Sequence, residues 1–147
     1  MPEASPSAQQ DAYSSLLAAL LAEDDDALTQ LVDPEAFTAR LPGTDTLSFS
    51  GYLAEFNRQR LAFSDIGRYI SMRQIVEQGN MLVLYYVMTM THDGPLLGIV
   101  TPGQLPPTGR RVEVPCVDIV RFDGHGRIVE VNVTSDRLST VEQLLRP

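Results

Sequence analysis

Two aspartates in the second half of the chain have the residue type and the setting to move protons. Asp136 stands between a strand pattern and a final helical pattern, so it either starts the helix by accepting backbone N–H groups or transfers protons at the mouth of a pocket. Asp118 alternates with the apolar residues Val114, Cys116 and Val120. A carboxylate among such neighbours must be solvated, paired or functional. Desolvation raises a carboxyl pKa, and such a group can remove a proton from carbon flanked by carbonyls.

Few other polar residues could assist such a carboxylate. If the last strand is regular, Asn132 shares a face with Asp136, and its amide could then hold a substrate oxygen. His92 ends a strand pattern just before a turn. Histidines there more often make turn hydrogen bonds, and lining a pocket is the alternative role.

Three aromatic residues are candidates for the wall of a pocket. Tyr86 could donate a hydrogen bond to an enolate, or it could pack in the core with its hydroxyl satisfied. Its neighbour Tyr85 points to the opposite face of the same strand. Tyr52 and Phe56, on a predicted helix, are candidates for the mouth of the pocket.

Composition limits the partners and the compartment. The chain has 147 residues, 44% of them hydrophobic, and a formal net charge of −8. Its surface therefore repels phosphate backbones and anionic lipids, so neither nucleic acid nor a membrane is an expected partner. The single cysteine, Cys116, cannot form an internal disulfide, and no metal site is expected around it. The first ten residues do not resemble a secretion signal, and a cytoplasmic protein is expected.

Helical patterns occupy the first part of the chain and its end. From Asp11 onward, one apolar stripe at helical spacing predicts a first helix. The acidic residues 23–26 predict the cap and first turn of a short second helix. A third helix is predicted over residues 50–63 and a last one over residues 139–146, each capped by its first residue, a serine.

Strand patterns with a period of two fill the chain after Gly67. Four long strands are predicted, over residues 68–78, 81–92, 110–122 and 127–135. Turn-forming residues join the first pair at residues 79–80 and the last pair at residues 123–126, so these neighbours should run antiparallel. A short edge strand is expected within residues 36–41.

Helices followed by long antiparallel strands predict an α+β fold. We expect a cone-shaped, strongly curved and mostly antiparallel sheet whose concave face is covered by the N-terminal helices. Such a cone encloses a ligand cavity unless side chains fill it. Residues 1–10 are expected to be a disordered lead-in, and residues 11–147 to form one domain.

Several motifs together carry a family resemblance. They are Phe63 with Asp65, Thr91-His92 followed by Gly94, the run Pro106-Pro107-Thr108-Gly109-Arg110, and the ending from Asp136 to Gln143. Together they resemble the SnoaL-like polyketide cyclases over roughly residues 11–146. That family belongs to the nuclear-transport-factor-two-like superfamily, with ketosteroid isomerase, scytalone dehydratase and limonene epoxide hydrolase as relatives.

The resemblance implies a role for Asp136, which holds the position of the family's general acid/base in an intramolecular aldol cyclisation. Neither a metal nor an organic cofactor is then required. The chain departs from the family where Val131 and Asn132 follow Glu130, since histidine and tryptophan are usual there. The loop between Gly98 and Pro106 is longer than usual in the family, and it is a candidate lid.

The residues and the resemblance together predict a cofactor-independent cyclase of secondary metabolism, with acid–base chemistry of the lyase or isomerase type. Its substrate would be an apolar, carbonyl-bearing small molecule such as a polyketide. Asp136 would be the general acid/base, and Asp118, Asn132 and His92 would orient or stabilise oxygen atoms. Tyr86, Tyr52 and Phe56 complete the set of predicted substrate-binding residues.

Other functions use a similar cavity. Isomerisation and dehydration need a different arrangement of polar groups, and epoxide hydrolysis needs an inward arginine, for which Arg73 and Arg121 are candidates. A non-catalytic binding or assembly module is the alternative from another class. Whether Asp136 and Asp118 face a cavity or solvent separates an enzyme from such a module.

Apolar residues on the outer sheet face predict a homodimer, and the resemblance points the same way. Val117 with Ile119, and Val129 with Val131, alternate on two neighbouring strands and need cover.

Overall fold

The computed structural model describes residues 6–97 and 104–147. Within them the helices are α1 (Ala8–Ala22), α2 (Asp25–Leu31), α3 (Phe49–Ala62) and α4 (Arg137–Leu145). The strands are β1 (Thr38–Arg40), β2 (Tyr69–Gln78), β3 (Met81–Thr91), β4 (Leu96–Leu97), β5 (Gln104–Leu105), β6 (Arg111–Phe122) and β7 (Ile128–Ser135). Residues 98–103, most of the loop predicted as a lid, lie outside the described residues.

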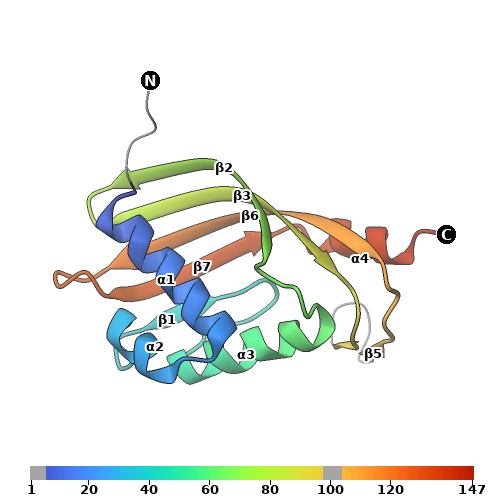
Figure 1. Ribbon diagram of the computed structural model, residues 1–147, viewed down its shortest axis with the longest axis horizontal. Coiled ribbons are helices and arrows are strands. Elements are labelled where there is room, and N and C mark those ends of the chain that lie inside the picture. Colours follow the sequence, from blue (N-terminus) through green and yellow to red (C-terminus); the bar gives the residue numbers. More distant parts are fainter. Residues whose placement is uncertain (1–5, 98–103) are drawn as a thin grey trace.

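Five strands form one mixed sheet in the order β1-β7-β6-β3-β2. β1 runs parallel to β7, and the other neighbours are antiparallel. The sheet is open, and it curves over α1, α2 and α3, which lie on one side of it (Figure 1). The predicted α+β architecture with a curved, mostly antiparallel sheet is confirmed.

Serine side chains determine the first residues of helices α1 and α3. Ser7 accepts the backbone N–H three residues ahead, so α1 begins at Ala8 rather than at Asp11. In the same way Ser48, and not the predicted Ser50, caps α3. Both helices then turn apolar side chains toward the sheet, where they form the core with the inner faces of β3 and β6.

The inner face of the sheet is set by the register of β6 and β7. Asp118 of β6 pairs with Val133, and Val120 pairs with Val131. Val131 is therefore buried, which corrects the prediction that it lies on the outer face. The cause is an irregularity at the start of the β6–β7 ladder, where Val129 has no partner and the alternation changes phase.

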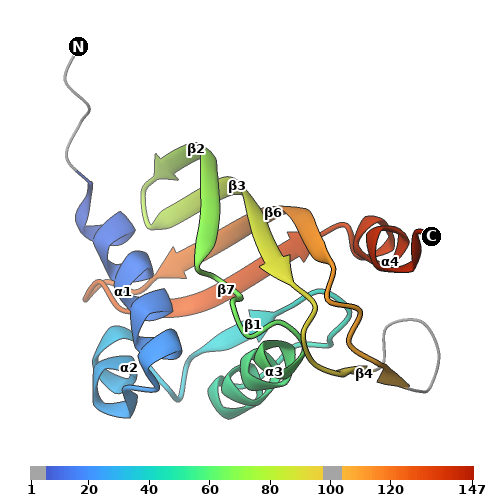
Figure 2. The same cartoon turned by 45° about the vertical axis from the view of Figure 1, so that its right-hand side comes forward.

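Helix α4 lies at the end of the sheet farthest from α1 (Figure 2). The Gln143 side chain fastens it to β6, because its amide donates to the carbonyl of Glu113 and accepts the N–H of the same residue, both at 2.9 Å. Leu144 adds a buried apolar contact. This attachment brings the first turn of α4 to the end of the concave face.

Candidate active site

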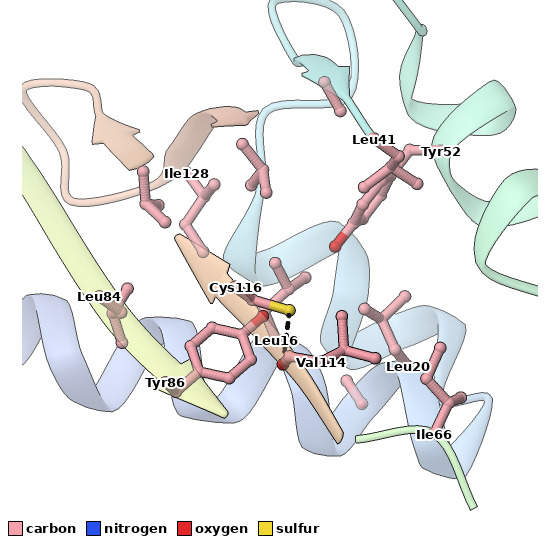
Figure 3. Close-up of a cluster of buried hydrophobic side chains, with 14 of the residues drawn as sticks. Leu16, Leu20, Leu41, Tyr52, Ile66, Leu84, Tyr86, Val114, Cys116 and Ile128 are labelled. Carbon is pink, nitrogen blue, oxygen red and sulfur yellow. Dashed lines mark hydrogen bonds between the residues drawn. The ribbon is translucent and has the colours of Figure 1, made fainter. Parts of the chain in front are cut away.

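The concave face of the sheet and the helices enclose a cavity of about 340 Å³. This volume suits a small organic ligand. Side chains from α1, α3, β2, β3, β6, β7 and α4 line the cavity, and most are apolar. Figure 3 shows part of this wall, where Tyr52 and Tyr86 enter from opposite sides and direct their hydroxyl groups toward the region of Cys116.

Asp118 is the buried carboxylate of this cavity. Its side chain is 3% exposed, and it forms no ion pair within residues 6–97 and 104–147. Tyr13 donates a hydrogen bond to Oδ2 at 2.6 Å, and Tyr86 donates to both carboxylate oxygens at 3.0 Å. Burial raises the pKa of Asp118 from 3.8 to about 6, and the two tyrosine hydrogen bonds limit that rise.

Three tyrosine hydroxyls belong to the same site. Burial raises the pKa of Tyr13, Tyr52 and Tyr86 above 10.0, and the negative charge of Asp118 raises it further. All three therefore stay protonated hydrogen-bond donors at neutral pH. The Tyr52 hydroxyl makes no hydrogen bond to any residue that the structure describes, so it is the donor available to a bound molecule.

Cys116 lines the cavity next to Asp118 on the inner face of β6. Burial raises the pKa of its thiol to about 12, with a smaller contribution from the charge of Asp118. The Sγ atom lies 3.5 Å from the carbonyl oxygen of Val114. A thiol that stays protonated is a poor nucleophile, so Cys116 serves as part of the apolar wall.

Asp136 is exposed and caps α4. Its Oδ1 accepts the backbone N–H of Ser139 at 2.9 Å, which makes Asp136 and not Ser139 the start of the helix. Asp136 does not line the cavity, although its neighbours Ser135 and Arg137 do. The reason is alternation, because the side chain of Asp136 follows the outer face of β7.

His92 is fully buried outside the cavity wall. Its Nδ1 accepts the backbone N–H of Thr108 at 3.1 Å and lies 2.9 Å from the hydroxyl of the same residue. Burial lowers the pKa of the ring, so His92 is neutral at pH 7. The histidine thus joins the end of β3 to the segment before β6, which matches the turn-bonding alternative.

The other predicted residues divide between the cavity wall and the outer face of the sheet. Tyr86, Tyr52 and Phe56 line the cavity. Asn132 does not, because it pairs with Ile119 on the outer face and donates to Glu130 at 2.7 Å. This placement corrects the expectation that Asn132 reaches the pocket.

Tyr13 and Arg137 are among the cavity residues that were not predicted from the sequence. Tyr13 belongs to the apolar stripe of the first helix, and a tyrosine on a buried stripe needs a partner for its hydroxyl. The hydroxyl of Tyr13 therefore indicated a buried polar partner, but the sequence could not identify that partner, because Asp118 lies 105 residues away in the chain. No sequence pattern marked Arg137 as a cavity residue, because it directly follows a helix cap.

The remaining charges of the wall come from α3. Glu55 and Arg58 line the cavity and form an ion pair at 2.7 Å. The two arginines considered for epoxide hydrolysis do not line the cavity, since Arg73 is exposed on β2 and Arg121 pairs with Glu130 at 3.5 Å.

Within residues 6–97 and 104–147 no cluster of His, Cys, Asp and Glu has the form of a metal site. No helix in the same residues is long and apolar enough to span a membrane.

Comparison with known proteins gives a family match over nearly the whole chain. The family model for SnoaL-like polyketide cyclases matches residues 10–144. A search of curated proteins finds no significant match.

Solved structures with the same fold include three bacterial proteins. A proposed SnoaL-like polyketide cyclase from Jannaschia sp. CCS1 is 20% identical, with a TM-score of 0.79 over 100% of this chain and 99% of its own. IdmH, a proposed polyketide cyclase from Streptomyces antibioticus, is 27% identical, with a TM-score of 0.72 over 92% of this chain and 97% of its own. TsrD from Streptomyces laurentii is 23% identical, with a TM-score of 0.73 over 97% and 98%.

Proposed function

Because this chain belongs to the family of SnoaL-like polyketide cyclases, we propose that it is a cofactor-independent cyclase that closes a ring by an aldol reaction. Asp118, rather than Asp136, is the general acid/base. The observation that carries this proposal is the position of Asp118, which is buried in the cavity, unpaired with any cation of the described residues, and has a pKa of about 6.

The carboxylate of Asp118 removes a proton from a substrate carbon next to a carbonyl group, and an enolate forms. That carbon then attacks a second carbonyl of the same molecule. The new carbon–carbon bond closes the ring and leaves an alkoxide. Asp118, now carrying the proton, returns it to the alkoxide, so the carboxylate is regenerated and no atom is gained or lost. A pKa near 6 suits both steps, because the group is mostly ionised at pH 7 and still a useful acid.

The tyrosines supply hydrogen bonds where negative charge develops. Tyr52 has a hydroxyl open to the cavity and donates to the enolate oxygen. Tyr13 and Tyr86 hold the Asp118 carboxylate in place between α1 and β3. The surrounding wall is apolar, which excludes water and strengthens each of these interactions.

Two of the alternatives are less well supported by this arrangement. Epoxide hydrolysis needs an arginine and two aspartates around one water, whereas Asp118 is the one aspartate among the described residues of the wall. A purely structural module has no need of a buried, unpaired carboxylate, since such a group destabilises the fold.

We expect proton abstraction to depend on pH through Asp118. The assay is loss of deuterium, followed by NMR, from the carbon next to the carbonyl of 2-tetralone, an apolar two-ring ketone. A base must be ionised, so the enzymatic rate should rise about tenfold per pH unit below the pKa of Asp118, about 6, and level off above it. Tyr86→Phe removes a hydrogen bond that lowers this pKa, so the midpoint should move to higher pH.

The matched control is Tyr85→Phe, since Tyr85 is the neighbouring tyrosine on the outer face. Its midpoint should equal that of the wild type. A wild-type midpoint near the ordinary aspartate value of 3.8 would contradict the role of Asp118 as a desolvated base.

We further propose that the chain forms a homodimer through the outer face of its sheet. Tyr69, Val76, Tyr85 and Val117 are exposed there by 37 to 52%, and such a large apolar surface is uncommon on a monomer. Sedimentation equilibrium should give twice the mass of one chain, and Val117→Lys should give the mass of a monomer. A monomeric wild-type protein at about 100 μM would rule the dimer out, since stable homodimers associate well below that concentration.

A further inference from the structure

We propose that the substrate of this cavity carries a carboxylate and that Arg137 binds it. This inference rests on the proposed function, and it adds the chemical class of the substrate. Arg137 is the first residue of α4, it is half-buried, and it lines the cavity together with Ser135 and Thr140. Within residues 6–97 and 104–147 its guanidinium forms no hydrogen bond and no ion pair.

The other charged groups of the wall already have partners. Arg58 is paired with Glu55 at 2.7 Å, and the carboxylate of Asp118 accepts hydrogen bonds from two tyrosines. Among the described residues of the wall, Arg137 is therefore the cation left for a ligand. The chain has a net charge of −8, so its overall field repels anions. An anionic substrate needs a local cation, and a planar guanidinium binds a carboxylate through two parallel hydrogen bonds.

The loop after β1 leaves room for the guanidinium. A Cβ atom at Gly43 would collide with Nη1 of Arg137 and would lie 2.5 Å from its Cζ. Gly43 also has a φ of +80°, which glycine adopts without strain. The guanidinium thus lies against the backbone at the end of the cavity, beside Leu41 and Pro42 of the same loop.

The register of the sheet sets the distance between Asp118 and Arg137, the two ends of the proposed site. Asp118 pairs with Val133, and Arg137 follows four residues later. β7 continues for two residues beyond Val133, at about 3.3 Å per residue, and α4 begins two residues later, so the two positions are on the order of 10 Å apart. A fused system of two or three rings spans that length. The substrate is accordingly an apolar polycarbonyl acid, bound with its carboxylate at α4 and its reacting carbon at Asp118.

The test compares two ligands of the same shape, anthraquinone-2-carboxylate and anthraquinone-2-carboxamide, by isothermal titration calorimetry with the full chain. We expect the wild type to bind the acid about tenfold more tightly than the amide, as for one charge-assisted pair. Arg137→Gln should remove this preference, because it should weaken binding of the acid more than binding of the amide. Arg146→Gln, at the other end of the same helix and outside the cavity wall, should keep it.

Equal affinity of the wild type for the two ligands would overturn the inference, as would a preference for the acid that survives in Arg137→Gln. Either result leaves the proposed function intact, because 2-tetralone carries no carboxylate and its deuterium exchange does not require Arg137. If the wild type binds neither ligand and also fails to exchange deuterium, the proposed function fails together with the inference.

Discussion

Asp118→Asn is expected to lower the enzymatic rate of deuterium exchange from 2-tetralone by about 10²- to 10⁴-fold, which is the usual contribution of a general base. Asparagine has nearly the same shape, and its carbonyl oxygen can still accept hydrogen bonds from Tyr13 and Tyr86. It cannot take up a proton at neutral pH. NMR detection of the deuterium remaining on the carbon, corrected for the rate in buffer, measures the effect.

Asp136→Asn is the matched control, because it makes the same chemical change 18 positions later in the sequence, at a carboxylate that caps α4. Asparagine is also a good helix cap, so both the exchange rate and the stability should stay close to those of the wild type. The opposite pattern, with activity lost in Asp136→Asn and kept in Asp118→Asn, would transfer the acid/base role back to Asp136.

A stability measurement shows whether Asp118→Asn is folded. The pKa of Asp118 is raised from 3.8 in the unfolded chain to about 6 in the folded protein. The folded state therefore holds this proton more tightly, and the free energy of unfolding falls as pH rises through that interval. The loss reaches about 3 kcal/mol above pH 6, at 1.36 kcal/mol per pH unit. Asp118→Asn avoids this loss, so it should be no less stable than the wild type at pH 7.

Tyr52→Phe is expected to lower the maximal exchange rate by about 10²-fold, the effect of removing one donor to a developing oxyanion. The Michaelis constant should change little, because the hydrogen bond is strongest in the enolate-like transition state. The pH midpoint should stay near that of the wild type, since Tyr52 makes no hydrogen bond to Asp118. A pH series of exchange rates at several 2-tetralone concentrations measures all three quantities.

Tyr85→Phe again serves as the control, and all its constants should match those of the wild type. A shift of the pH midpoint in Tyr52→Phe, without loss of the maximal rate, would mean that Tyr52 acts only on the ionisation of Asp118. An unchanged rate and an unchanged midpoint would leave Tyr52 as a packing residue.

Local sequence signals were sufficient for most of the fold. The alternation in residues 111–122 and the turn residues at positions 79–80 and 123–126 predicted the antiparallel strands, and the register confirms them. Helix starts were less well predicted, because several neighbouring residues could cap. Ser48 and Ser50 are both acceptable caps, and in the structure Ser48 accepts the backbone N–H of Gly51.

The candidate site was predicted only in part. Asp118, Tyr86, Tyr52 and Phe56 were named from the sequence, and all four line one cavity. Asn132 was predicted on the cavity side, but it lies on the outer face. An irregularity near Val129 reverses which residues of β7 face inward, and no residue type at that position predicts it.

The sequence by itself determined the local structure, because periodicity and turn chemistry act between residues that are close in the chain. It also determined that Asp118 had to be solvated, paired or functional. The tertiary structure alone decided which of the two aspartates faces the cavity, since that depends on the register of β7 against β6. It also brought Tyr13 to Asp118 and Arg137 to the end of the cavity, because contacts between distant segments form only when the sheet and the helices pack together.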